Sequence, residues 1–462
     1  MAQFGDLRLE KKSAVLRAAI QQRHCLVVRQ LAPDRATQVS FYRLLANPAV
    51  TVEGLLDTQA AEAGLNTVTG HVLALTDTTA LDLRRHAGRL RPDTVGPLSS
   101  KGNGLGLFLH PVLCLAADED APQPVLGISS LQHWHRPATP AADKDRTRPL
   151  ASKESHKWLV AGQQTRQRLP QATRITRVGD REGDVYEALT GLVAAGLDFV
   201  VRSRDDRRLA DAAPGPAGRL VAHLAAGPEQ GRYTVPVTRT AATTPHPTRV
   251  ATLAVRFAPV TLRRPARLRP EQAAATLPCW AVDVQEIAPP PGEAPVHWRL
   301  LTTHAVADAD DARRIVGYYA RRWWIEQLFR VLKQQGLQVE ASQLTNGQAL
   351  VRLVALALPA ANAVMQLVLG RQNLAPQPVL DAPALACLHQ LAPTLDGRTE
   401  KQRNPHPPAS LAWVSWCIAR LGGWSGLASQ RPPGVITLTH GWQHFQRLYQ
   451  GWKLAQAFVC TP

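Results

Sequence analysis

The sequence contains little cysteine, and what it has is scattered. Its six cysteines lie far apart along 462 residues, and none belongs to a CxxC pair. We therefore expect neither a structural zinc site nor a thioredoxin-type redox centre. The first residues carry no apolar signal stretch, so the expected location is the reducing cytoplasm. No glycine-rich run continues into Gly-Lys-Ser or Gly-Lys-Thr, so neither a nucleotide nor an organic cofactor is expected.

Acidic residues and lysine are both scarce relative to arginine. The chain has 53 Lys and Arg against 36 Asp and Glu, a formal net charge of +17, and only nine of the cations are lysines. The excess favours a polyanionic partner such as nucleic acid. Arginine suits phosphate because its planar fork donates two hydrogen bonds, although genomic base composition produces the same preference.

The chain is long and apolar enough for more than one domain. With 462 residues and 45% apolar side chains, two or three domains with buried cores are expected. Residues 349–369 are apolar enough to raise the question of a membrane span. They include Arg352 and Pro359 and follow a charged amphipathic helix. A buried core helix is therefore the preferred interpretation, and no membrane association is expected.

The order of predicted elements indicates an α/β protein. Apolar runs that end in polar clusters predict strands over residues 71–77, 104–116, 124–135, 174–180, 197–204 and 297–304. Helical periodicity predicts helices over residues 9–23, 38–45, 153–169, 184–195 and 308–335. Residues 206–295 are rich in Pro, Thr, Val and Arg, which predicts a β-rich insertion. The last fifty residues hold five tryptophans at spacings suited to packed helices.

Two aspartates each follow a predicted strand. Asp77 ends the run HVLALTD, and Asp180 ends the run RITRVGD. In α/β sheets, active sites gather at the carboxyl ends of strands. An aspartate there also serves as a helix cap or turn residue, so the two strand ends alone leave both interpretations open.

A third carboxylate lies on the long predicted helix. At about 100° per residue, Tyr319, Arg322, Glu326 and Lys333 fall within about 60° on one face. Such a stripe is also typical of a surface ladder of ion pairs. Three carboxylates from two strand ends and a helix can, however, hold one or two divalent cations, which prefer hard oxygen ligands. Such ions would reconcile an acidic centre with a polyanionic substrate and support a phosphodiester displacement.

These motifs resemble the bacterial DDE transposases of insertion-sequence family four. The resemblance rests on Asp77 in DTT, on Asp180 in DRE, and on the spacing Tyr-x2-Arg-x3-Glu-x6-Lys from Tyr319 to Lys333. The segments SKESHKWL (152–159) and FVVRSR (199–204) resemble family segments around the active site. The resemblance covers nearly the whole chain.

The resemblance implies an α/β fold with flanking helical domains. An RNase H-like catalytic domain over residues 61–370 would carry the β-rich insertion at 206–296. A helical domain that binds DNA ends would occupy residues 1–60. A helical dimerisation domain would occupy residues 371–462.

The resemblance also implies roles for individual residues. Asp77, Asp180 and Glu326 would be catalytic and would ligate two Mg²⁺ ions, for which Mn²⁺ can substitute. Trp298 would stack on a flipped base. The remaining DNA contacts would be Tyr319, Arg322, Lys333, Arg330, Trp323, Arg202 and Arg204. Two positions depart from the family pattern, because Arg330 stands in place of a lysine and Trp324 in place of a basic residue.

The implied activity is cut-and-paste DNA transposition by a homodimer that bridges two DNA ends. It would comprise end nicking, hairpin formation, hairpin resolution and strand transfer to target DNA, without a nucleotide. The protein would lie in the bacterial cytoplasm, on the nucleoid when bound to DNA. Two alternatives stay open: an RNase H-like structure-selective nuclease without strand transfer, and a non-catalytic DNA-binding protein derived from a transposase. The three carboxylates argue against the second alternative.

Overall fold

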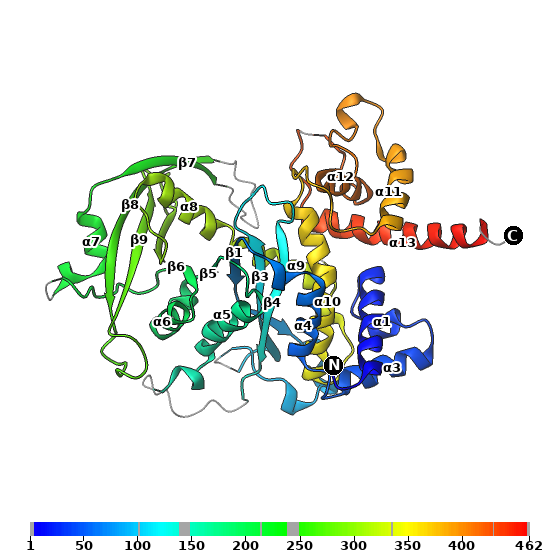
Figure 1. The fold of residues 1–462 in the computed structure, drawn as a ribbon, viewed down its shortest axis with the longest axis horizontal. Helices are drawn as coiled ribbons and strands as arrows, with labels where there is room; N and C mark the ends of the chain where they lie inside the picture. Colours follow the sequence, from blue (N-terminus) through cyan, green and yellow to red (C-terminus); the bar gives the residue numbers. More distant parts are fainter. Residues whose placement is uncertain are drawn as a thin grey trace.

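A ten-stranded mixed sheet forms the centre of the protein (Figure 1). The computed structural model describes residues 4–99, 102–137, 148–212, 215–237, 249–333, 336–427 and 429–459. The strands are β1 (His71–Thr76), β2 (Thr79–Asp82), β3 (Gly106–Ala116), β4 (Val125–Trp134), β5 (Arg174–Gly179), β6 (Asp198–Arg202), β7 (Gly231–Val237), β8 (Arg249–Arg263), β9 (Thr276–Glu286) and β10 (His297–Thr302). They pair in the order β2-β3-β1-β5-β6-β10-β9-β8-β7, and β4 also pairs with β3.

The strand directions bring two of the predicted aspartates to one edge of the sheet. Strand β1 is antiparallel to β3 and parallel to β5, and β5 is parallel to β6. Because parallel strands end at the same edge, Asp77 after β1 and Asp180 after β5 lie at a common edge. The strands predicted over residues 71–77 and 174–180 are confirmed.

Helices cover both faces of the sheet, as alternation along the strands requires. Val72 and Ala74 of β1 pack in a cluster with α5 (Lys157–Arg168) and α6 (Tyr186–Ala194). Leu73 and Leu75, on the opposite face, pack in the cluster of α8 (Ala309–Ala320), α9 (Trp323–Leu332) and α10 (Gly347–Leu369). The strand that leads to Asp77 is therefore supported on both faces by buried apolar residues.

The predicted β-rich insertion extends the same sheet. Strand β10 is antiparallel to β6, and β9, β8 and β7 follow it as an antiparallel series. The helix α7 (Leu220–Ala226) lies between β6 and β7 in the chain. In Figure 1 this part of the sheet lies at the side of the molecule away from the N-terminal helices. The insertion is β-rich, as its composition predicts.

Helices from the two ends of the chain pack together. The N-terminal helices are α1 (Leu7–Arg23), α2 (Val28–Leu31), α3 (Arg35–Ala46) and α4 (Val52–Glu62). The C-terminal helices are α11 (Ala382–Leu395), α12 (Leu411–Leu421) and α13 (Val435–Val459). Helix α1 contacts both α10 and α13. The helices predicted over residues 9–23 and 38–45 are confirmed, and the apolar side chain of Val15 in the first of them is 56% exposed.

The single helix predicted over residues 308–335 is wrong, because the chain forms two helices there. Helix α8 ends at Ala320 and α9 begins at Trp323. The helix is interrupted because two adjacent arginines bind at opposite ends of β1. Arg321 donates to the carbonyls of Ala116 and Ala117 beside the start of β1, at 2.6 and 2.8 Å. Arg322 reaches Asp77 beyond the other end of β1.

Helix α10 is the one described helix that is long and apolar enough to cross a membrane. Most of its apolar stretch is buried inside the protein, against α1, α4, α9, α13 and β4. Burial of this kind is typical of a core helix, in agreement with the interpretation of residues 349–369.

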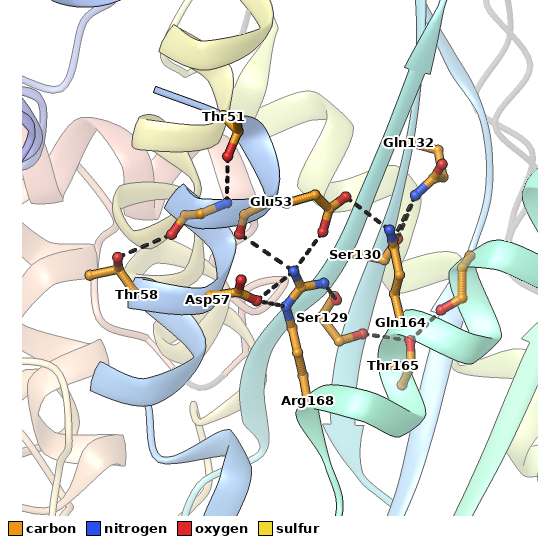
Figure 2. A network of polar contacts seen from close by, with 12 residues as sticks. Thr51, Glu53, Asp57, Thr58, Ser129, Ser130, Gln132, Gln164, Thr165 and Arg168 are labelled. Carbon is orange, nitrogen blue, oxygen red and sulfur yellow. Dashed lines mark hydrogen bonds and ion pairs between the residues drawn. The ribbon is translucent and has the colours of Figure 1, made fainter. Parts of the chain in front are cut away.

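A polar network joins α4 to α5 and β4 (Figure 2). Its centre is Arg168, whose side chain is only 8% exposed. Arg168 donates to Asp57 at 2.9 Å, to Glu53 at 2.7 Å and to the carbonyl of Ser129 at 2.7 Å. Three elements are thus fixed to one another by one guanidinium.

Replacement of Arg168 by Met is expected to lower the free energy of unfolding by about 2–4 kcal/mol. The substitution leaves a buried carbonyl and two carboxylates without their hydrogen-bond donor. The free-energy cost is smaller than for a fully buried ion pair because Glu53 and Asp57 are half-exposed. Denaturant titration followed by circular dichroism measures the change. Arg174→Gln, which breaks the surface pair with Asp198, is the control and should change stability by less than about 0.5 kcal/mol. Equal losses in both variants would contradict a structural role of Arg168.

Candidate active site

Asp77 and Glu326 are brought together by one arginine. The guanidinium of Arg322 donates to Asp77 Oδ2 at 2.7 Å and to Glu326 Oε1 at 2.8 Å. All three side chains are largely buried, with exposed fractions of 16% for Arg322, 20% for Asp77 and 30% for Glu326. A strand end and a helix 249 residues apart in the sequence thus meet in one charged cluster.

Asp180 is held at the neighbouring strand end. Its Oδ1 accepts a hydrogen bond from the amide of Glu182 at 3.0 Å, which begins the short 3-10 turn Arg181–Gly183. Its charge acts on Asp77 and on Lys157. The three carboxylates predicted from the sequence therefore share one electrostatic environment.

Burial has the largest effect on the pKa of Asp77. It raises the pKa of Asp77 from 3.8 to about 6, and the charges of Asp180 and Glu326 act in the same direction. The amide of Thr78 and the charge of Arg322 oppose the shift. The pKa of Arg322 is raised, because its hydrogen bond to Glu326 and the charge of Asp77 outweigh its burial. An additional positive charge at this edge of the sheet would therefore be stabilised.

The donor chemistry suits a hard divalent cation. Carboxylate oxygens are what Mg²⁺ and Mn²⁺ prefer, and Asp180 Oδ2 and Glu326 Oε2 accept no hydrogen bond from the described residues. Within those same residues, no three His, Cys, Asp or Glu side chains are already disposed around a common metal position. In this structure the positive charge between Asp77 and Glu326 is the guanidinium of Arg322.

Tyr319 and Trp298 form an aromatic contact beside the cluster. Tyr319 is buried on α8, and its ring meets that of Trp298 on β10 edge to face, with centroids 6.0 Å apart. Trp298 is only partly buried and packs against the main core. The structure thus brings these two predicted residues together, and Tyr319 lies about one helical turn before Arg322 in the chain.

Lys333 lies apart from the three carboxylates. It caps the C-terminal end of α9, and its ammonium donates to the carbonyl of Ala80 at 2.5 Å. Glu340 is its nearest carboxylate, at 4.0 Å. The predicted stripe is interrupted because α8 and α9 are separate helices and α9 ends at Leu332.

The other predicted DNA contacts lie around the cluster rather than in it. Trp323 is 49% exposed on α9, and the guanidinium of Arg330 lies 5.8 Å from the centre of its ring. Arg202 donates to the carbonyl of His297 at 2.7 Å, while the exposed Arg204 pairs with Asp205 at 3.2 Å. Whether these four side chains bind DNA stays a prediction.

A comparison with known families bears on this arrangement. Residues 159–363 match the transposase DDE domain. The match supports a DDE transposase, and so an enzyme that acts on DNA. The matched segment contains Asp180 and Glu326, and the mixed sheet covered by helices is consistent with the nuclease fold of a DDE transposase.

Two cations near the three carboxylates were not predicted from the sequence. Lys157, with 10% of its side chain exposed, lies 3.8 Å from Glu182. Burial lowers the pKa of Lys157, and the charges of Glu182, Glu154, Asp77 and Asp180 oppose that shift. The segment SKESHKWL, which resembles a family segment near the active site, contains this lysine and could have indicated it.

The second cation, Arg177, lies beneath the site in β5. It is fully buried, and its guanidinium lies 4.5 Å from the centre of the Trp158 ring. Burial lowers the pKa of Arg177 to about 10, against the charges of Asp180 and Asp184. Trp158 in turn meets His110 edge to face at 4.4 Å, and His110 contacts Thr78 at 3.0 Å. A buried stack therefore connects the turn after β5 to the residue that follows Asp77.

Proposed function

We propose that the protein is a cut-and-paste DNA transposase of insertion-sequence family four, with an RNase H-like core. The observation that carries the proposal is the meeting of Asp77 and Glu326 on Arg322, with Asp180 at the adjacent strand end. The core order β4-β3-β1-β5-β6, antiparallel and then parallel, supports the same proposal. So does the net charge of +17, which suits a DNA substrate.

Asp77, Asp180 and Glu326 are the proposed ligands of two Mg²⁺ or Mn²⁺ ions. When bound, such ions supply an activated oxygen nucleophile and stabilise the leaving oxygen of a phosphodiester displacement. Arg322 is placed to offer its donors to a phosphate oxygen once the carboxylates no longer hold them. Lys157, near Asp77 and Asp180, offers a further positive charge for the phosphate.

The proposed reaction consists of four displacements at phosphorus. Water attacks the phosphorus at the element end, the bond to the 3′ oxygen breaks, and a 3′-hydroxyl is freed. That hydroxyl attacks the phosphorus of the opposite strand, displaces the 3′ oxygen of the flanking DNA and forms a hairpin. A second water attacks the hairpin phosphodiester, whose 3′ oxygen leaves, so that the 3′-hydroxyl is freed again. The 3′ end then attacks target DNA, and the displaced 3′ oxygen of the target leaves. Each attack is in line with the bond that breaks.

The remaining residues have proposed roles in holding DNA. Trp298 would stack on a flipped base, supported from behind by Tyr319. Exposed Trp323 and Arg330 on α9 would contact the strand near Glu326. Lys333, Arg202 and Arg204 would bind phosphates around the site, with Lys333 exchanging its carbonyl contact for a phosphate. The N-terminal helices would bind the element ends.

A homodimer that bridges two ends is part of the proposal. Trp413, Trp416 and Trp442 are buried within the chain and so support the C-terminal helices rather than an interface. The last turns of α13 extend beyond the body of the protein, with Leu454 63% and Phe458 80% exposed (Figure 1). These apolar side chains are the proposed dimer contact. The proposed location is the cytoplasm, on the nucleoid when DNA is bound.

Supercoiled plasmid that carries the DNA flanking the coding sequence on both sides is expected to be cut by the protein in the presence of Mg²⁺. The products should be nicks at the element ends, then hairpins, then joints to a second plasmid, because one site performs all four displacements. Denaturing gels with end-labelled DNA identify each species. Cleavage without joined products would instead support a structure-selective nuclease.

The control is Glu326→Gln, which keeps the hydrogen-bonding shape of the side chain but removes its charge. It should bind the same DNA and yield none of the products. If this variant cut as fast as the wild type, or if wild-type protein bound the DNA without any cleavage, the catalytic proposal would fail.

A further inference from the structure

A groove lined by arginines lies on the insertion, outside the cluster of carboxylates. Its cavity of about 730 Å³ is bordered by six arginines and only two aspartates, Asp205 and Asp206. The arginines come from the segment after β6, from the residue before α7, and from the end of β8 and the turn that follows it: Arg207, Arg208, Arg219, Arg263, Arg264 and Arg267. These residues are called the arginine groove below.

Three of the six arginines are committed to the fold. Arg207 is buried against the fully buried carboxylate of Asp184. Arg219 donates to the carbonyl of Asp206 at 2.9 Å, and Arg264 donates to the carbonyl of Ala273 at 3.0 Å. These contacts give the groove rigid walls.

The other three arginines are exposed, and the charge of only one of them, Arg267, acts on a carboxylate of the groove, that of Asp205. Arg208, Arg263 and Arg267 make no side-chain hydrogen bond or ion pair with any residue that the structure describes. Surface arginines elsewhere on the insertion do have carboxylate partners, such as Arg232 with Glu229 and Arg269 with Glu271. Three free guanidinium groups in one hollow therefore favour an anionic ligand with several phosphates.

The arginine groove continues toward the active site. A second hollow of about 720 Å³ shares Asp205 and Arg267 with it and is also lined by Lys157 and Glu182. Lys157 lies close enough for the charges of Asp77 and Asp180 to act on it. The two hollows thus join the arginine groove to Lys157 on the side of the active site, along a lining that also includes Glu154 and Glu187.

We propose that the arginine groove holds the backbone of target DNA, an assignment that rests on the proposed transposase function. Guanidinium groups bind phosphates of any sequence, as a target of varied sequence requires. DNA flanking the element is covalently joined to a bound end and needs no capture site of its own, whereas target DNA arrives as a separate molecule. Helix α7 and strand β8, which border the groove, lie at the far end of the molecule from α1 and α3, the proposed end-binding helices (Figure 1).

The test is the full-length variant R208Q/R263Q/R267Q, compared with the wild type in separate cleavage and joining reactions. Joining of pre-cleaved ends to plasmid at low target concentration should fall about tenfold or more. The slope of log affinity for plain duplex DNA against log salt should decrease by about 2.7, or 0.9 for each lost phosphate contact. Cleavage of end-labelled element DNA should stay within about twofold of the wild type, and excess target should restore joining.

The matched control is R232Q/R269Q/R313Q, which removes the same charge from exposed arginines that pair with Glu229, Glu271 and Asp310. It should join at nearly the wild-type rate. Unchanged joining in R208Q/R263Q/R267Q would overturn the proposal, and so would an equal loss of cleavage and joining, which would assign the groove to the element end. If the wild type cleaves no DNA, the proposed transposase function fails. The salt dependence of duplex binding tests the groove independently: the same slope in R208Q/R263Q/R267Q as in the wild type would exclude phosphate binding by the groove.

Discussion

The D77N variant is expected to be inactive and yet more stable than the wild type. Its rate of end cleavage should fall by about 10³-fold or more, because several kcal/mol of charge stabilisation in the transition state depend on this carboxylate. Its free energy of unfolding at pH 7 should rise by about 1–3 kcal/mol. The rise follows from the pKa of Asp77, which burial raises from 3.8 to about 6, at about 1.4 kcal/mol for each unit.

The sign of the pH dependence provides the check. Because the folded protein holds a proton on Asp77 more tightly than the unfolded chain, the contribution of Asp77 to wild-type stability should rise as the pH falls from about 7 to about 4. Histidines such as His24 and His71, whose pKa burial lowers to about 4, act in the opposite direction in both proteins. The stability advantage of D77N over the wild type should therefore shrink over this range. Urea titrations of both proteins at several pH values without divalent ions measure it. A D77N protein less stable than the wild type at pH 7 would contradict a free-energy cost of burying the Asp77 carboxylate.

The G183A variant is expected to lose both stability and activity. A Cβ atom at Gly183 would lie 2.0 Å from the terminal nitrogen of Arg177, which is fully buried and cannot withdraw. The turn that holds Asp180 must then shift, at a cost of about 2–4 kcal/mol in the free energy of unfolding. A displacement of about 1 Å at a catalytic group lowers the rate of cleavage by about 10²-fold.

Two further variants test whether the clash with Arg177 is the cause. Gly88→Ala adds the same methyl group where no atom lies within 4 Å, and it should change neither stability nor cleavage. Arg177→Lys in the G183A background shortens the buried side chain and should recover about half of the lost stability. Purely additive effects of the two substitutions, measured in a double-mutant cycle, would rule out a direct contact.

Local sequence patterns were sufficient for six of the strands, including the two that lead to Asp77 and Asp180, but not for the short strand β2. The run that ends in Asp77 is almost continuously apolar, as a strand covered on both faces requires, whereas the run that ends in Asp180 also contains Arg174, Thr176 and Arg177. Glu326 was predicted because residue spacing on a helix is nearly fixed. The prediction of Glu326 needs only a helix around that residue. It therefore holds although residues 308–335 form two helices instead of one.

What the sequence could not reveal depends on contacts between distant segments. The break between α8 and α9 arises from the anchoring of Arg321 and Arg322 on strands some two hundred residues earlier. Arg177 would be read from its sequence as a surface residue of β5, yet Gly179 and Gly183 leave room for it beneath the site. The free arginines of the insertion become a groove only when the turn between β8 and β9 lies against residues 205–208.

The bridge that Arg322 makes between Asp77 and Glu326 has a thermodynamic consequence. The same guanidinium serves as the counter-charge of the carboxylates and as a donor suited to phosphate. A phosphate that draws Arg322 away leaves two carboxylates whose charge then favours a cation, and a cation there releases Arg322 for phosphate. In the proposed transposase, binding of DNA and binding of metal would thereby be linked, so that each would raise the affinity for the other by the same factor.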